Sequence, residues 1–482
     1  MPARHIRVEE NLPEPIREGF VALRETLGVP SDFPPEVLAE AEEVVRDGYD
    51  QSLGHRDMTD IPFITIDPPG SMDLDQAMHI SRTDSGGFLV QYAIADVAAW
   101  VRPGGAIDQE AHRRGQTYYA PHERSGLHPP TLSEAAASLL DDGVARPALV
   151  WRIELDEDGE IISAFVERGL VKNTARLDYA QVQADIDRGT AIETLMLLKQ
   201  VGGLRHFMEL QRGGVSLRLP DQEVDAVGND WRLVYREQLP DEDWNAQISL
   251  MTGFSAAKMM LDAGVGILRT LPPAEPRTIK ALRRVAHSLN LPWPRKVAYA
   301  GFVQSLDPRR PQDQAMMMAC VRLFRGAGYT VINPVLKPDE TVHGALASNY
   351  AHTTAPLRRL VDRYVGEICV ALCAGTDVPQ WVLDALPELP EIMRESDRRA
   401  KAFERGTNDL VESLVLEHRV GESFQGVVIQ VDEKRPGQGI VSLTDPAVEA
   451  PVSGRGLELG DEVTVELTKV DLHQGKVQFQ VR

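Results

Sequence analysis

Cysteine is scarce in this chain of 482 residues, which holds only Cys320, Cys369 and Cys373. Three is too few, and an odd number, for a disulfide framework. Cys369 and Cys373 lie four residues apart in an apolar helical stretch with no further cysteine or histidine nearby. That setting favours packing in the core over a zinc site.

Long apolar runs and net positive charge are also missing. No apolar run reaches the length of a membrane span, and the N-terminus lacks the apolar segment of a signal peptide. We therefore expect a protein without membrane segments in a reducing, cytoplasmic compartment. The net charge of −21 argues against a protein that coats nucleic acid with its whole surface. It does not exclude an enzyme whose basic groups line an internal channel.

Aspartates are concentrated beside a short apolar run near residue 70. Residues Ile61 to Ile66 are typical of a buried strand, Asp67 ends that strand, and Asp73 and Asp75 follow a Pro-Pro-Gly turn. Three carboxylates within nine residues can converge on one point, where oxygen ligands suit a hard cation such as magnesium. Short Asp-rich loops are also common as solvated turns or helix caps, so the spacing alone leaves both interpretations open.

The pattern of the chain divides it into three segments. Residues 1–58 are helical, with helices expected over Pro13 to Leu27 and Pro35 to Gly48, either as a helix-turn-helix-like module or as a packing arm. Residues 59–417 mix early strands with later helices, which predicts an α+β domain: a sheet with helices packed on one side. Residues 420–482 carry five short strands separated by Gly, Pro and Asp turns, which fits a small barrel of the OB type.

Individual elements can be placed within these segments. A strand is expected over Phe88 to Ala95, and an Asp-Glu-Asp-Gly turn predicts a hairpin of Val150 to Leu155 with Ile161 to Leu170. Apolar residues at helical spacing predict helices over 189–212, 241–263, 277–290, 312–327, 356–374 and 388–416. The barrel strands are predicted over Phe424–Val431, Gln438–Leu443, Glu449–Val452, Asp461–Val470 and Lys476–Val481.

Three groups of motifs follow one another in a recognisable order. The first is the segment from Asp57 to Gln76, and the second includes Ala95-Asp96-Val97, Arg114 to Pro121 and Leu132-Ser133-Glu134. The third runs from His343 through Tyr350-Ala351-His352-Thr353-Thr354-Ala355-Pro356-Leu357-Arg358-Arg359 to Asp362. This ordered series resembles the ribonuclease II family, whose catalytic domain is called RNB, and the final barrel is similar to that family's OB-fold RNA-binding module.

The resemblance implies a processive 3′-to-5′ exoribonuclease that hydrolyses single-stranded RNA to nucleoside 5′-monophosphates. A barrel and channel contained within one chain make a monomer the simpler expectation. The resemblance also implies magnesium, or manganese in its place, as the cofactor. Asp67, Asp73 and Asp75 would then be metal ligands, with Asp75 most directly tied to catalysis. Gln76 would offer its carbonyl oxygen to the same cation.

The resemblance also assigns substrate contacts. Arg358 would grip a phosphate through a bidentate fork that a lysine cannot reproduce, and Arg359 beside it would bind RNA. Tyr119 would stack on a base near the 3′ end without reading its identity. Glu404 would help to place the 3′-terminal residue. Plainer alternatives remain: a pair of Arg358 with Asp362 on one helix face, a core position for Tyr119, and a solvated ion pair for Glu404.

The chain departs from the family pattern in three places. Gln76 stands where the pattern has a further aspartate, and Ala246-Gln247-Ile248 lacks an expected glutamate. The first 58 residues are also too few for the two cold-shock barrels that usually precede the RNB domain. Phe424 and Phe479, the only aromatic residues of the barrel, offer little surface for base stacking.

These departures leave two alternatives to an active exoribonuclease. One is an RNA-binding protein with a weakened or inactive RNB site, and the other is a metal phosphodiesterase acting on another phosphoester. The joint presence of Asp67, Asp73, Asp75 and Arg358 favours the enzyme, because an unused site has no chemical reason to keep three mutually repelling carboxylates.

Overall fold

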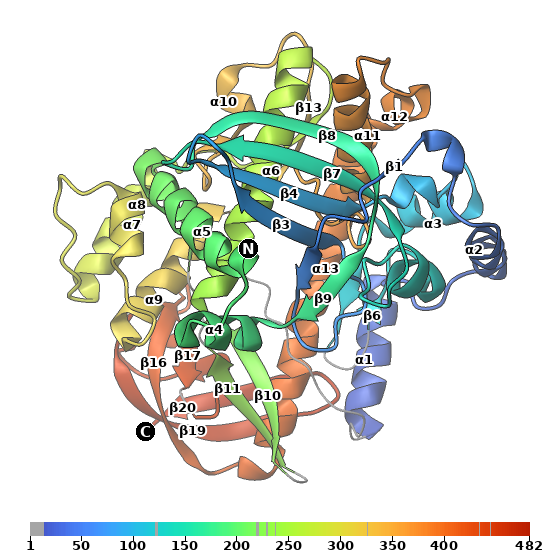
Figure 1. Cartoon of the computed structure of the whole chain (residues 1–482). Coiled ribbons are helices and arrows are strands. Elements are labelled where there is room, and N and C mark those ends of the chain that lie inside the picture. The colour runs from blue at the N-terminus through green and yellow to red at the C-terminus, as the bar shows by residue number, and fades with distance from the viewer. Residues whose placement is uncertain are drawn as a thin grey trace.

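The centre of the protein is a mixed seven-stranded sheet in the order β1-β8-β7-β4-β3-β2-β9 (Figure 1). The structure, a computed structural model, describes residues 14–120, 124–217, 221–227, 230–236, 238–324, 326–432, 434–443 and 445–482. Neighbouring strands of the sheet are antiparallel except for the parallel pairs β1–β8 and β2–β9. The strands are β1 Arg56–Asp57, β2 Phe63–Ile66, β3 Gln76–Arg82, β4 Phe88–Ala95, β7 Arg146–Leu155, β8 Ile161–Val171 and β9 Asn173–Leu177.

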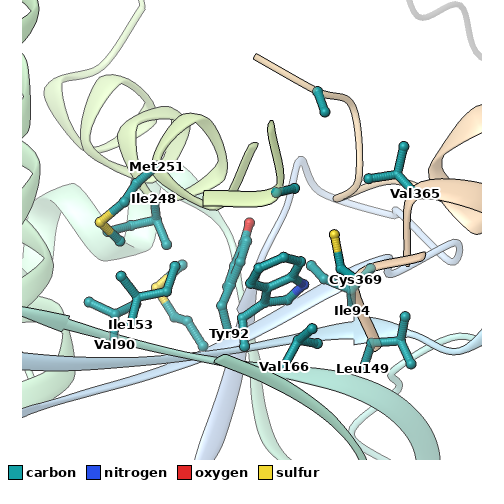
Figure 2. Packing of buried hydrophobic residues seen from close by; sticks show 14 of the residues in the cluster. Val90, Tyr92, Ile94, Leu149, Ile153, Val166, Ile248, Met251, Val365 and Cys369 are labelled. Carbon is teal, nitrogen blue, oxygen red and sulfur yellow. The ribbon is translucent and has the colours of Figure 1, made fainter. Parts of the chain in front are cut away.

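Alternation along the strands separates two cores. On β4, Val90, Tyr92 and Ile94 face a core shared with the long helices α5 (Glu193–Arg212), α6 (Pro240–Ala263) and α11 (Leu360–Ala374). Figure 2 shows Tyr92 rising from the sheet in this core, with its hydroxyl oxygen pointing away from the strands. The long helices thus pack on one side of the sheet, as predicted. Part of the other face is covered by α2 (Pro35–Asp47), α3 (Ala106–Arg114) and the segments 97–101 and 132–140.

Most predicted elements are present, with shifted ends. The helix predicted over 312–327 is shorter than expected: α9 spans Pro311–Cys320 and is followed by a short 3-10 turn. The chain then forms strand β13 (Gly328–Val331), which pairs with β12 (Ile267–Thr270). Gly326 lies between the 3-10 turn and β13, and its φ of 89° is one that glycine adopts readily. The remaining helices are α1 Glu14–Leu27, α4 Tyr179–Arg188, α7 Pro276–Ser288, α8 Tyr299–Gln304, α10 Pro338–Thr341, α12 Gln380–Ala385 and α13 Leu389–Leu416. Further short strands are β5 Tyr118–Tyr119, β6 Arg124–Ser125, β10 Asp221–Val227, β11 Asp230–Arg236, β14 Val342–His343 and β15 Ser348–Asn349.

The C-terminal strands close into the predicted five-stranded barrel. Its strand order is β16-β17-β18-β20-β19, and its only parallel pair is β18–β20. The aromatic residues Phe424 and Phe479 pack edge to face inside it with ring centroids 5.7 Å apart, so neither can stack on a base. The strands are β16 Ser423–Val431, β17 Gln438–Leu443, β18 Glu449–Ser453, β19 Glu462–Asp471 and β20 Lys476–Val481.

Helix α13 connects the barrel to the rest of the molecule (Figure 1). Its Leu410, Val411 and Leu414 share one core with Ile16 and Phe20 of α1 and with the barrel interior. Helix α2 belongs to a different core, beside the sheet. The two N-terminal helices therefore pack on different parts of the protein, which favours the packing arm. The boundaries at residues 58 and 420 remain a proposal.

No helix in the described part of the chain is long and apolar enough to cross a lipid bilayer. Cys320 and Cys369 are buried, as expected for core cysteines, and Cys373 is half-buried.

The first turn of α6 carries a buried carboxyl, and its titration gives a testable pH dependence. Asp241 is fully buried; this burial raises its pKa to about 7, and the neighbouring Glu242 adds to the increase. Because the folded pKa exceeds the unfolded value of about 4, stability falls as the pH rises from 4 to 7. We expect Asp241→Asn to raise the free energy of unfolding by about 3 kcal/mol at pH 8 and by much less at pH 4.5.

Denaturant unfolding at both pH values checks this expectation, with Asp187→Asn, an exposed aspartate of α4, as the matched control. If Asp241→Asn changed the free energy of unfolding equally at pH 4.5 and pH 8, ionisation of the buried carboxyl would not destabilise the fold, and the expectation would be wrong.

Candidate active site

The aspartate loop, residues 67–75, connects the antiparallel neighbours β2 and β3 at one end of the sheet. Its conformation is fixed from outside by Ser138, whose hydroxyl accepts a hydrogen bond from Leu74 N at 2.9 Å and donates one to Met72 O at 2.6 Å. Leu74 is itself fully buried, and its carbonyl accepts from Leu139 N at 3.0 Å. Asp73 and Asp75 are therefore held on either side of an anchored residue.

Asp75 is the most enclosed of the three carboxylates, with 4% of its surface exposed. Its Oδ1 accepts a hydrogen bond from Leu357 N at 2.8 Å, and its Oδ2 accepts one from Arg358 Nε at 3.2 Å. Burial raises the pKa of Asp75 to about 8, although Arg358 and the Leu357 amide act in the opposite direction. The carboxyl therefore has less positive charge around it than its ionised form needs.

Asp67 and Asp73 lie in the same electrostatic environment. Burial raises the pKa of Asp67 to about 7, Arg358 opposes that increase, and Asp73 adds to it. Asp73 accepts a hydrogen bond from Arg124 through Oδ1, and the Tyr119 hydroxyl lies 3.5 Å from its Oδ2. Within the described ranges, no three carboxylate, imidazole or thiolate groups stand together in a metal-binding arrangement. The three aspartates are thus neighbours without forming one ligand cage.

The arginine loop, residues 353–359, leads into α11 and faces the aspartate loop. Arg358 contacts Asp75, while Arg359 makes two hydrogen bonds to Asp362, Nε to Oδ2 at 3.0 Å and Nη2 to Oδ1 at 2.7 Å. Asp362 Oδ1 also accepts from Ala355 N at 2.7 Å. The ion pair with Asp362 on the helix face therefore belongs to Arg359. The Arg358 side chain stays 43% exposed and accessible to a ligand.

Tyr119 and Arg124 are cross-strand partners in the β5–β6 hairpin, so their side chains leave it on the same face, above Asp73. Tyr118 is buried beneath this hairpin against Phe403 of α13. Glu404, the next residue of α13, is half-buried on the helix that packs against β5. Pro121, part of the same motif, lies outside the described residues.

Gln76, the first residue of β3, makes two hydrogen bonds across the site. Its Oε1 accepts from the Tyr92 hydroxyl, and its Nε2 donates to Thr354 O at 2.7 Å. Gln247, from the segment that lacks the expected glutamate, is buried, and its Nε2 donates a hydrogen bond to Glu209 Oε2 at 2.6 Å.

The donor set can be compared with the needs of a hard cation. Asp67 and Asp75 fit: they are carboxylates, and their raised pKa values show a shortage of positive charge. Asp73 fits by its chemistry, but here Arg124 supplies its counter-charge. The Gln76 oxygen is already used by a phenol, so it fits least well.

Several residues of the site escaped the sequence analysis. Arg124, Tyr92 and Ser138 join the site only through tertiary structure, and Thr354 was a member of the third motif group without an assigned role. Only Tyr92 left a usable signal, because its position in an alternating strand predicts which face it occupies.

Two domain families match the chain: the RNB domain over residues 55–374, and the RNase II-type exonuclease C-terminal S1 domain over residues 422–482. Ribonuclease R of Aquifex aeolicus is 25% identical over 523 residues, an alignment that covers 100% of this chain and 72% of the relative.

Solved structures show the same fold. Mycoplasma genitalium RNase R in complex with ribose-methylated single-stranded RNA superposes with a TM-score of 0.85 at 17% identity, covering 97% of this chain and 78% of the other. Yeast Ssd1, a pseudonuclease, superposes with a TM-score of 0.68 at 17% identity, covering 86% of this chain and 52% of the other. The match to the RNB domain spans well over half of the residues, and the chain therefore belongs to the RNB family of 3′-to-5′ exoribonucleases.

Proposed function

We propose that this protein is an active, divalent-metal-dependent enzyme that degrades single-stranded RNA from its 3′ end and releases nucleoside 5′-monophosphates. The contact of Asp75 with Leu357 N and Arg358 carries the proposal. It joins two motif groups separated by 282 residues into one site that holds a carboxylate and an accessible guanidinium.

Each residue has a role that follows from its position. Arg358, partly exposed beside the carboxylates, would bind the scissile phosphate and offset the charge that develops on it. Tyr119, half-buried above Asp73, would bind the terminal base, because an aromatic face accepts any base. Asp362 keeps Arg359 and the Ala355 amide in place, so that the Arg358 backbone is presented correctly.

Asp67 and Asp75 would hold the cation, magnesium or manganese, and Asp73 would join them when it exchanges Arg124 for the metal. A bound divalent cation would supply positive charge at the phosphate and make a water molecule more acidic. The raised pKa values mean that Asp67 and Asp75 hold protons near neutral pH, and these protons must leave before a cation binds. The affinity of the site for the cation therefore depends on the ionisation of these two carboxyls.

The test uses 5′-labelled single-stranded RNA with magnesium, beside the same reaction in EDTA and a DNA of matched sequence. We expect products that shorten from the 3′ end, nucleoside 5′-monophosphates by mass spectrometry, and loss of cleavage in EDTA. A chase with excess unlabelled RNA measures processivity, since a processive enzyme finishes the labelled strand it holds. Equal cleavage of DNA would contradict the substrate assignment.

A second function, RNA binding without hydrolysis, is favoured by two observations. Gln76 brings no negative charge to the site, and Asp73 is paired with Arg124 instead of standing free. The similarity to a protein described as a pseudonuclease shows that this fold occurs without nuclease activity. RNA binding in magnesium without any shortening of the labelled strand would establish this second function and overturn the first.

A further inference from the structure

We propose that Gln76 is a positioning residue that ties the arginine loop to the sheet and so orients Arg358, and that it takes no part in holding a cation. The inference rests on the proposed function, because Arg358 is the phosphate-binding group there. It assigns a role to one of the positions at which this chain departs from the family pattern.

Both ends of the Gln76 amide are used inside the protein. The carbonyl oxygen Oε1 accepts the hydrogen of the fully buried Tyr92 hydroxyl, and Nε2 donates to the Thr354 carbonyl oxygen at 2.7 Å. The orientation of the amide follows from its partners. A backbone carbonyl can only accept, so the nitrogen must face Thr354 and the oxygen must face Tyr92.

This tie is one of a set that encloses the arginine loop. On one side, Asp75 of the aspartate loop binds Leu357 N, and Gln76 of β3 binds Thr354 O. On the other side, α6 binds the segment through the Ser249 hydroxyl, 2.7 Å from the Thr354 hydroxyl, and through Gly253 O, which accepts from Ala351 N at 3.1 Å. The last residue of the aspartate loop and the first residue of β3 therefore hold the arginine loop at positions three residues apart, directly before Arg358.

Neither role suits a cation ligand. A metal at Oε1 would compete with the Tyr92 hydroxyl for the same carbonyl oxygen, and a displaced hydroxyl would stay buried without an acceptor. An aspartate at position 76 could not donate to Thr354 O and would turn a negative oxygen toward that carbonyl. With Gln76 in place of an aspartate, the site has one negative charge fewer, and the arginine loop gains a hydrogen bond to the sheet.

A double-mutant cycle tests the positioning role. We expect Gln76→Ala to lower kcat by about 10- to 100-fold with a smaller change in KM, because a displaced phosphate-binding group loses mainly transition-state contacts. In an Arg358→Ala background, Gln76→Ala should change kcat less than threefold. Full additivity of the two losses would overturn the proposal. Gln380→Ala, an exposed glutamine on α12, is the matched control.

A manganese titration followed by electron paramagnetic resonance tests the second part of the proposal, that Gln76 does not bind the cation. Gln76→Ala should bind the same number of Mn²⁺ ions as the wild type, with a Kd within threefold. Loss of an ion, or a tenfold weaker Kd, would make Gln76 a ligand and overturn the proposal. If Gln76→Ala does not fold, Tyr92→Phe, which removes the buried partner of Oε1, replaces it in the double-mutant cycle. In the manganese titration Gln76→Leu replaces it, because leucine fills a similar space and offers no ligand atom.

The outcome stays separate from that of the proposed function. If the wild type hydrolyses no RNA, the same cycle is measured on the Kd for RNA in EDTA, where Arg358 still binds phosphate. Non-additive losses of affinity would then support the role of Gln76 even though the enzymatic function had failed, and additive losses would reject it.

Discussion

Asp75→Asn should lower kcat for RNA hydrolysis by about 10³-fold or more while leaving RNA affinity within a few-fold. The substitution keeps the shape of the side chain and its acceptor for Leu357 N, but it removes the charge. That charge serves two partners at once: it orients Arg358 through Oδ2 and would bind the cation. Single-turnover cleavage of labelled RNA at saturating enzyme measures the chemical step, and fluorescence anisotropy in EDTA measures binding.

The fold of this variant should be at least as stable as the wild type at pH 7, because the pKa of about 8 shows that burial disfavours the ionised carboxyl. Asp187→Asn, at an exposed aspartate of α4, serves as the matched control for the loss of one aspartate. If Asp75→Asn lowered kcat by less than tenfold, Asp75 would have no direct role in the chemical step. A parallel loss of RNA binding would mean that the substitution disturbs the structure of the site instead.

Arg358→Lys should reduce kcat/KM by about 10²-fold. Lysine keeps the positive charge but offers no planar fork, so it cannot contact Asp75 through one nitrogen and present the others to a phosphate. The Nε contact to Asp75 at 3.2 Å uses only one edge of the guanidinium, and the side chain remains partly exposed. Steady-state kinetics with a short single-stranded RNA gives the ratio.

Arg359→Lys is the matched comparison, since it makes the same chemical change one residue away. Arg359 is held by two hydrogen bonds to the buried Asp362, so we expect the free energy of unfolding to fall by about 2 kcal/mol and kcat to change less than fivefold. If Arg359 also binds RNA, as the sequence suggested, KM will rise in this variant. An equal loss of kcat in both variants would contradict the separate roles.

The sequence was sufficient for the regular elements and for the order of the motifs. Strand β4 and strands β17 and β20 of the barrel have the predicted bounds, because alternation and turn residues are local signals. The error at residues 312–327 has a local cause as well. An apolar stretch continues through Gly326 into β13, and only the pairing with β12 decides that its last part is a strand.

The contacts within the site were beyond the sequence, since they join distant segments. No sequence signal near Asp75 predicts its contact with Leu357, and none near Gln76 predicts its contacts with Tyr92 and Thr354. Two arginines precede Asp362 at helical spacing, and the choice between them depends on α11 beginning at Leu360, with Arg359 as its cap. The expectation that Gln76 offers an oxygen to a metal assumed a free amide, which a single sequence cannot test.

Helix α13 has a consequence for how the barrel can be studied. Leu410, Val411 and Leu414 are buried jointly by α1 and the barrel, and Phe403, two turns earlier on the same helix, supports Tyr118 beneath Tyr119. The barrel and the β5–β6 hairpin therefore belong to one cooperative folding unit. Truncation before residue 420 would expose this apolar strip and loosen the helix that supports the hairpin. A loss of activity after such a truncation would report on the integrity of the catalytic centre, and it would not measure how much RNA the barrel binds.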